Sequence, residues 1–257
     1  MFLRKISAVL LAVYALVVAY IVLGFFFGVE YRSFFTPLST LIAFIFAVDH
    51  SSQRLGWGRA LLLLGLTFAV SLFFESVGVA TGWIYGPYHY TDKLGYKFLG
   101  LVPLIIPVAW FMLSYPSFII ASRLIPRWKS LWVWRLSVAA VGAVIMTAWD
   151  LAMDPMMVAG EHWVWDVPGA YFGIPLQNFW GWWLTVFASF MTYQLLAGRG
   201  AKPVRAKFDR LAIASYLVTG AGVVCAALLA GMGGIALTGL FAMLPWVLMG
   251  WLRMEAG

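Results

Sequence analysis

Long apolar segments, separated by short polar connections, run through almost the whole chain. A helix needs about 20 mostly apolar residues to cross the hydrocarbon core of a membrane. Eight segments meet or approach that length, at about 6–28, 34–49, 60–82, 98–122, 131–152, 174–197, 211–230 and 234–252. The second is short, and only a Gly-rich break at 231–234 separates the last two, so seven spans is the alternative count. The pattern predicts an all-α, polytopic transmembrane bundle that forms a single integral membrane domain over residues 1–257.

The composition supports a chain that sits in lipid. Apolar residues make up 63% of the 257 residues and charged residues only 11%. A soluble domain carries about 25% charged residues, so water is not the main solvent of this chain. We therefore expect a multi-pass protein of the cell membrane, without a conventional soluble domain.

The formal charge of +7 comes from basic residues whose positions indicate the orientation of the chain in the membrane, not a nucleic-acid partner. Fourteen of the 17 basic residues fall on alternate connections: Arg4, Lys5, Arg54, Arg59, Arg123, Arg127, Lys129, Arg135, Arg199, Lys202, Arg205, Lys207, Arg210 and Arg253. The other connections carry Arg32, Lys93 and Lys97. Cytoplasmic loops are enriched in Lys and Arg, so both termini are predicted to be cytoplasmic, which requires an even number of spans. Membrane lipid is an expected partner, and nucleic acid is not.

The first apolar segment and the sole cysteine are both compatible with a multi-pass membrane protein. The first segment has a basic start and a long apolar run, but no small-x-small cleavage site follows, so we expect a retained helix rather than a signal peptide. Cys225 is the sole cysteine and lies in an apolar segment, where we expect an inert buried thiol.

Two connections on the predicted outer side are rich in Gly, Pro, Trp and Tyr. One spans about 83–95 and the other about 153–173. Such residues build turns with aromatic bodies rather than flexible spacers. An interfacial belt of Trp and Tyr is the ordinary explanation for many of these rings. It explains less well why the rings cluster on one side and surround acidic residues.

Three acidic residues are predicted to lie at membrane depth, where ionisable groups are costly and mark function by default. Glu75 lies about 6 Å from the centre of its span, on the outer side. Asp150 and Asp154, spaced four apart, share a face if their helix extends that far. Two close carboxylates in a low-dielectric site do not both ionise easily, so one of them would stay available to donate a proton. The alternative is that these acids pair with Arg, cap helices or bind hydroxyls.

The remaining polar candidates favour structural roles. Asp49-His50 lies at the cytoplasmic end of its span and suits an interfacial polar pair, and Asp92 suits a turn. The three histidines have no helical metal-ligand spacing, so no metal is predicted, although a site made by His89, His162 and a carboxylate is an alternative. Nucleotide-binding glycine motifs are absent, and no lysine follows Lys207 to form a retinal Schiff base.

Two ordered motifs resemble one known family. The first runs Glu75-x-x-Gly78-x-x-Thr81-Gly82-Trp83-x-Tyr85-Gly86-Pro87-Tyr88-x-Tyr90-Thr91-Asp92-x-Leu94-Gly95. The second combines Asp150-Leu151-x-x-Asp154-Pro155-Met156, Trp163-x-Trp165 and Tyr171-Phe172-Gly173-Ile174-Pro175-x-x-Asn178-x-x-Gly181-Trp182. Together they resemble the CruF-type membrane carotenoid hydratases, often described simply as carotenoid biosynthesis proteins, over residues 70–190.

The resemblance implies a carotenoid 1,2-hydratase. Members of this family add water to the terminal C1–C2 double bond of an acyclic carotenoid end group of the lycopene, γ-carotene or bisanhydrobacterioruberin type. An acid protonates C2, a tertiary cation forms at C1, and water captures it. The chemistry needs a proton donor, aromatic faces and a narrow water supply, and it needs no cofactor. The expected partner is a carotenoid that enters from the bilayer.

The resemblance and the residue chemistry together define a candidate site. The proton donor is predicted to be Asp150 or Asp154, with Glu75 orienting water or sharing the proton. The candidate substrate contacts are Trp83, Tyr85, Tyr88, Tyr90, Trp163, Trp165, Tyr171 and Asn178. For each ring, belt or packing is the alternative role, and for Asn178 an interhelical hydrogen bond is the alternative.

Three rival functions share some of these features. A carotenoid cyclase also protonates a terminal double bond but excludes water. An isoprenoid transferase would use Asp150-x-x-x-Asp154 as half of a diphosphate site, yet the chain has no second Asp-rich motif to complete a Mg²⁺ site. A carotenoid or lipid carrier, or a small-solute transporter, is the non-enzymatic alternative, and inverted repeats or broken helices would favour it.

The charge asymmetry predicts the orientation of the chain. A reporter enzyme that works only in the cytoplasm should be active when it is fused after the last residue, because basic connections stay on the cytoplasmic side. A matched fusion inserted near Lys93 should give the opposite readout. An exported reporter at the C-terminus would overturn the predicted topology.

Overall fold

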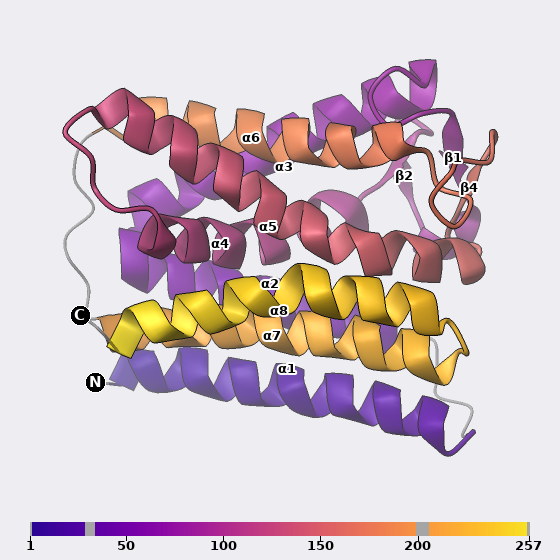
Figure 1. Ribbon diagram of the computed structural model, residues 1–257, viewed down its shortest axis with the longest axis horizontal. Helices are drawn as coiled ribbons and strands as arrows, with labels where there is room; N and C mark the ends of the chain where they lie inside the picture. The colour runs from indigo at the N-terminus through magenta and orange to yellow at the C-terminus, as the bar shows by residue number, and fades with distance from the viewer. Residues whose placement is uncertain (1, 29–33, 199–205, 256–257) are drawn as a thin grey trace.

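The computed structural model describes residues 2–28, 34–198 and 206–255, and these form a bundle of long helices (Figure 1). The helices are α1 Phe2–Phe26, α2 Phe35–Leu55, α3 Trp57–Thr81, α4 Ile105–Leu124, α5 Leu131–Ala159, α6 Leu176–Leu196, α7 Ala206–Leu229 and α8 Gly233–Glu255. The short elements are β1 Tyr88–Tyr90, η1 Asp92–Leu94, β2 Lys97–Phe98, β3 Val102–Pro103 and β4 Trp163–Trp165. Each of the eight predicted segments corresponds to one α-helix, and the Gly-rich break does separate α7 from α8.

Two predicted boundaries differ most from the structure. The segment predicted from residue 98 becomes helical only at Ile105, because the preceding residues pair as the small hairpin of β2 and β3. Gly100, at φ +72°, supplies the left-handed turn between these strands. The segment predicted to end near residue 152 continues through Pro155 to Ala159. Hydropathy reports burial and not hydrogen-bond geometry, so neither boundary was visible in the apolar pattern.

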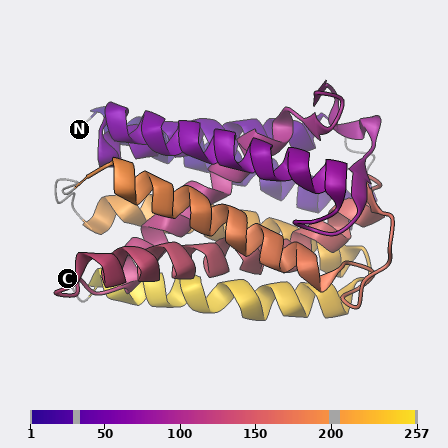
Figure 2. The same cartoon turned by 90° about the horizontal axis from the view of Figure 1, so that it is seen from above.

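Six of the helices in the described ranges are long and apolar enough to cross a membrane, namely α1, α3, α4, α5, α7 and α8. The remaining two, α2 and α6, each have 21 residues, which is about 30 Å of helix and enough to span the hydrocarbon core. Both run alongside the other helices in two perpendicular views (Figures 1 and 2). Their lower hydropathy reflects polar residues that face the interior of the bundle, such as His50 and Asn178.

Helix α4 is the centre of the bundle. It packs against α2, α3, α5, α7 and α8, and every residue from Trp110 to Ala121 is buried. In contrast, α1 lies at the edge and exposes side chains such as Leu16 and Val9. Exposed apolar side chains on a peripheral helix are what a lipid-facing surface requires.

The two ends of the bundle differ in character. The start of α1 and the finish of α8 lie at one end, which we call the termini end (Figure 1). The opposite end, the loop end, carries the strands and the connections 82–104 and 160–175. Of the basic residues counted above, Arg32, Arg199, Lys202 and Arg205 lie outside the described residues.

A buried ion cluster ties three helices together at the termini end. Asp209 of α7 is fully buried and accepts from Arg54 Nε at 2.7 Å and from Arg123 Nε at 2.6 Å. Nearby, His50 bonds to Tyr115 Oη at 2.6 Å and to the Phe208 carbonyl oxygen at 2.9 Å. The predicted polar pair at 49–50 is therefore split: His50 is a buried helix contact, and Asp49 accepts from Ser7 Oγ at 2.6 Å.

Asp209→Asn should destabilise the bundle, because it leaves two cations facing a buried site without a counter-charge. The arginine side chains keep 13% and 28% exposure, so we expect the lower part of the usual range for a broken buried pair, about 3 kcal/mol. The midpoint of thermal unfolding in detergent would measure this loss. Asp92→Asn, which breaks an exposed pair with Lys97, is the matched control and should change the midpoint little. Equal midpoints for both variants would contradict the role given to Asp209.

Candidate active site

The two aromatic loops pair with each other at the loop end. Strands β1 and β4 run antiparallel, with Tyr88 opposite Trp165 and Tyr90 opposite Trp163. Alternate residues of a strand point to opposite faces, so these four aromatic side chains share one face of the ribbon. That face is turned into the protein, whereas His89 on the other face is exposed. The ribbon therefore covers the ends of α3 and α5 with two phenols and two indoles.

Tyr85 is held between two helices by glycines. Helix α3 ends at Gly82, whose φ of +70° lets the chain fold back onto the helix. A Cβ at Gly78 of α3 would lie 2.5 Å from the Tyr85 ring, and one at Gly181 of α6 would lie 2.3 Å from it. The phenol then bonds to Thr185 Oγ1 at 2.8 Å. These glycines of the two motifs are thus explained by close packing around one buried tyrosine.

Glu75 is held by three aromatic donors. Its Oε2 accepts from Tyr88 Oη and, at 2.9 Å, from Tyr90 Oη. Its Oε1 accepts from Trp110 Nε1 at 3.0 Å. Three donors on two oxygens is the pattern that suits an ionised carboxylate.

Asp150 and Asp154 share one amide. Helix α5 does extend past Asp154, so the two side chains lie on one face, and Asn178 Nδ2 of α6 lies 2.7 Å from Oδ2 of each. Asp154 Oδ1 also accepts from Trp163 Nε1 at 2.7 Å and from Trp165 Nε1 at 3.3 Å. Asp150 Oδ1 has no hydrogen-bond partner among the described residues. The two carboxyl groups are therefore unequally supplied with donors.

No ion pair neutralises these acids within the described part of the chain. Glu75, Asp150 and Asp154 are only 3%, 0% and 1% exposed. Each side chain that donates a hydrogen bond to one of them is an indole, a phenol or an amide. Burial, together with the Glu75 carboxylate, raises the pKa of Tyr88 and of Tyr90 well above the usual value. Both phenols therefore keep their protons and act as donors to Glu75.

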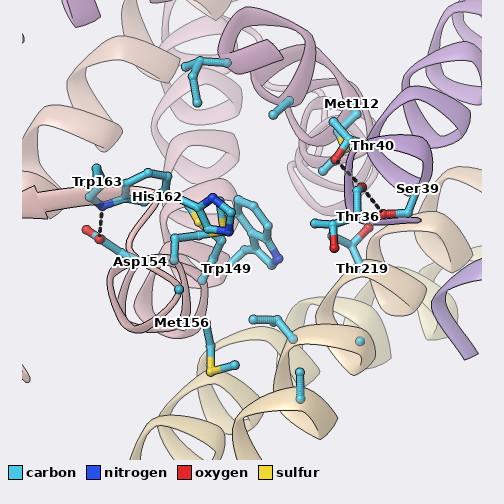
Figure 3. A pocket seen from close by; sticks show the side chains of 18 of the residues that line it. Thr36, Ser39, Thr40, Met112, Trp149, Asp154, Met156, His162, Trp163 and Thr219 are labelled. Carbon is cyan, nitrogen blue, oxygen red and sulfur yellow. Dashed lines mark hydrogen bonds between the residues drawn. The ribbon is translucent and has the colours of Figure 1, made fainter. Parts of the chain in front are cut away.

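Two of the three acids border a cavity of about 340 Å³, which we call the carboxylate cavity. Glu75 and Asp154 line it, and it extends between the helices toward α1, α2 and α7. Its aromatic walls near the acids are Tyr85, Tyr88, Tyr90, Trp110, Trp149, Trp163, Trp165 and Trp182. Figure 3 shows Asp154, Trp163 and His162 on one side and the hydroxyls of Thr36, Ser39, Thr40 and Thr219 across the cavity.

Most of the predicted site residues meet here, and three do not line the cavity. Tyr85, Tyr88, Tyr90, Trp163, Trp165 and Asn178 line it together with Glu75 and Asp154. Asp150 is not a lining residue and is connected to the cavity through Asn178 and Asp154. Trp83 is 81% exposed, so the prediction that it contacts substrate in this cavity is not supported.

Tyr171 has a structural place instead of a cavity position. Pro155 lies inside α5 and has no N–H, so the carbonyl four residues earlier, that of Leu151, loses its helical donor. Tyr171 Oη donates to that carbonyl at 2.8 Å. The tyrosine thus replaces the missing helix bond and allows α5 to continue past both aspartates.

Several cavity residues were missed in the sequence. Trp110, Trp149 and Trp182 lie in apolar helices, where an aromatic residue is ordinarily packing, and Trp110 stacks on Trp182 with ring centroids 4.3 Å apart. His162 was considered only as a metal ligand, and it lines the cavity. The segment that contains Trp110 carries no acidic residue, so nothing in its sequence pointed to the contact with Glu75.

The described residues contain no group of three or more His, Cys, Asp or Glu side chains arranged to hold a metal ion. In the alternative site suggested by the two histidines, His89 instead bonds to Asp166 at 2.7 Å on the exposed face of the ribbon. His162 lies on the cavity side.

These features define a helical membrane protein with a buried acid site under an aromatic ribbon at one end of the bundle. The chain belongs to the carotenoid biosynthesis protein family, whose sequence model matches residues 31–246 and so includes α2 to α7, the three buried acids and both aromatic loops.

A curated relative adds a name for the activity of one family member. The chain is 37% identical over 126 residues to a bisanhydrobacterioruberin hydratase of Haloarcula japonica. The match covers 49% of this chain and 41% of that relative, so the chain aligns with less than half of the relative's length. No solved structure gives a significant match.

Gly181→Ala should disturb the site through Tyr85. Its Cβ would meet the Tyr85 ring at 2.3 Å and the Ile84 carbonyl oxygen at 2.7 Å, and the latter is backbone that yields little. We expect a loss of about 1–3 kcal/mol in the free energy of unfolding, measured by thermal melting in detergent. Gly58→Ala is the matched control, because its Cβ would meet nothing within 4 Å. A Gly181→Ala protein as stable as the control would show that the close packing around Tyr85 is not needed.

Proposed function

We propose that this protein is a carotenoid hydratase that adds water across the terminal C1–C2 double bond of an acyclic carotenoid end group. The observation that carries the proposal is the pair of buried aspartates bridged by Asn178, beside an aromatic cavity and with no cation paired to them among the described residues. Family membership and the relative named as a hydratase support the same chemistry. The protein would act as a multi-pass enzyme of the cell membrane.

The proton comes from the aspartate pair. Two negative charges so close in a buried site cost more than one, so the pair holds a proton. Asp154 lines the cavity and Asp150 does not, so Asp154 delivers the proton to C2 and Asp150 is the buried partner that shares it. The proton forms the new C2–H bond, the C1–C2 π bond breaks, and a tertiary cation remains at C1.

The cation is stabilised by the surroundings of Glu75. Three donors hold this carboxyl group in the pattern that stabilises its charged form, and it lies on the wall of the same cavity. A fixed negative charge in a site of low dielectric stabilises a positive charge strongly. The faces of the surrounding indoles and phenols add cation–π attraction. Water then forms the C1–O bond, and loss of a proton gives the tertiary alcohol.

The size of the cavity and its place in a membrane protein suit a long apolar substrate. A cavity of about 340 Å³ lies at the lower end of the range for small-ligand sites, about 300–1,000 Å³. It suits the end group of a long polyene, with the rest of the molecule between helices or in lipid. The reaction adds water to the carotenoid without oxidation or reduction, so it uses no cofactor.

Amide variants test the acid assignment. Asp154→Asn, Asp150→Asn and Glu75→Gln keep the size of the side chain and one acceptor oxygen but remove the acid or the charge. In a host that accumulates lycopene or bisanhydrobacterioruberin, Asp154→Asn should lose about 10²-fold or more of the activity, the lower range for general acid catalysis. Asp92→Asn, at an exposed turn, is the control and should retain activity.

Product analysis tests the reaction itself. The pigment made by the parent protein should gain one water, with ¹⁸O from labelled water in the new hydroxyl and solvent deuterium at C2. A pigment of unchanged mass but altered absorption would indicate cyclisation, and an unchanged pigment would indicate a carrier. Full activity in all three amide variants would overturn the acid assignment even if hydration occurred.

A further inference from the structure

We infer that His162 is the base that takes the proton from the attacking water, an inference that rests on the proposed hydratase function. The ring lines the carboxylate cavity, as do Glu75 and Asp154. Figure 3 shows it projecting into the cavity on the side of Asp154 and Trp163. Its Nδ1 is buried and has no hydrogen-bond partner among the described residues. A buried nitrogen without a partner at a ligand cavity is free to bind water or ligand, and in the tautomer with the proton on Nε2 this nitrogen is an acceptor.

The backbone fixes the position of this ring. After α5, the His162 N–H donates to the Met157 carbonyl oxygen at 3.0 Å, and the His162 carbonyl accepts from Thr91 N at 3.1 Å and Thr91 Oγ1 at 3.2 Å. A Cβ at Gly160 would lie 3.0 Å from His162 Cδ2 and 3.2 Å from Nε2, so the ring packs closely against that glycine. Both sides of the turn therefore hold the imidazole at the cavity wall.

The other candidate bases are less suitable. Glu75 already accepts from three donors, and Asp154 accepts from three as well. In the proposed reaction the aspartate pair has just given up its proton and takes one back at the end of the cycle, so the imidazole acts first and receives the proton from the attacking water. Burial, and then the positive charge of Lys93, lower the pKa of His162, so the imidazole is neutral at neutral pH and its Nδ1 can accept. Glu161, the neighbouring acid, is paired with Lys93 at 2.8 Å.

The step balances without any further reactant. Water attacks the C1 cation, the C1–O bond forms, and one water proton passes to Nδ1. The imidazolium then returns its proton through water to the aspartate pair, which restores the acid for the next substrate. His162 would thus govern capture of the cation, whereas Asp154 governs its formation.

Exchange in deuterated water separates these two steps. In His162→Gln, protonation at C2 continues but capture is slow, so the cation returns to alkene. We expect alcohol formation to fall by about 10²-fold, while the recovered substrate gains deuterium. Asp154→Asn should lose alcohol formation without gaining deuterium, because no cation forms. His89→Gln, on the exposed face of the same ribbon, is the matched control and should behave like the parent.

A second variant covers the case in which the glutamine side chain distorts the turn. His162→Ala leaves space for a free imidazole, and added imidazole should restore alcohol formation in proportion to its concentration. Restoration, or deuterium uptake without alcohol, supports the base. Alcohol formation within a few-fold of the parent in both variants overturns it, as does a loss with neither exchange nor rescue. If the parent forms no alcohol from either carotenoid, the proposed function fails and the role of His162 fails with it.

Discussion

The site depends on the cost of burying three carboxyl groups without a cation. A charged group moved away from water loses several kcal/mol of solvation unless protein dipoles replace it. Here the replacement consists of phenol, indole and amide donors, and most of them come from the two aromatic loops. The burial of these carboxyl groups therefore depends on the pairing of β1 with β4. This pairing places the donors on one face of the ribbon: Tyr88, Tyr90, Trp163 and Trp165.

The donors also divide the acids into different chemical tasks. Glu75 receives three donors and suits a permanent negative charge, whereas Asp150 has one donor and an oxygen with no partner in the described residues. Asp154 lies between them in function, since it is both well supplied with donors and open to the cavity. A gradient of this kind separates a cation stabiliser from a proton reservoir, although all three groups are carboxyls.

Much of this arrangement could be predicted from residue chemistry, and the residues that lie elsewhere than expected have physical reasons for their positions. The apolar pattern predicted the helices, and acids at membrane depth pointed to the site because such groups are costly there. Trp83 was grouped with its aromatic neighbours, yet it follows the turn at Gly82 and faces outward. Tyr171 was taken as a substrate contact, whereas Pro155 requires it as a hydrogen-bond donor. Trp110 was invisible, because a Trp in an apolar helix carries no sign of what its N–H binds.

The two ends of the bundle show why buried charge has opposite consequences in one molecule. At the termini end Asp209 is matched by Arg54 and Arg123, so its charge is fixed and its contribution is to hold helices together. Near the loop end, the buried carboxyls of Glu75, Asp150 and Asp154 have only neutral donors among the described residues, and these donors stabilise a charge without supplying one. A carboxyl held in this way can gain or lose a proton without breaking an ion pair. Proton transfer to a hydrocarbon, as in the proposed reaction, requires a carboxyl group with that freedom, and Asp209 does not have it.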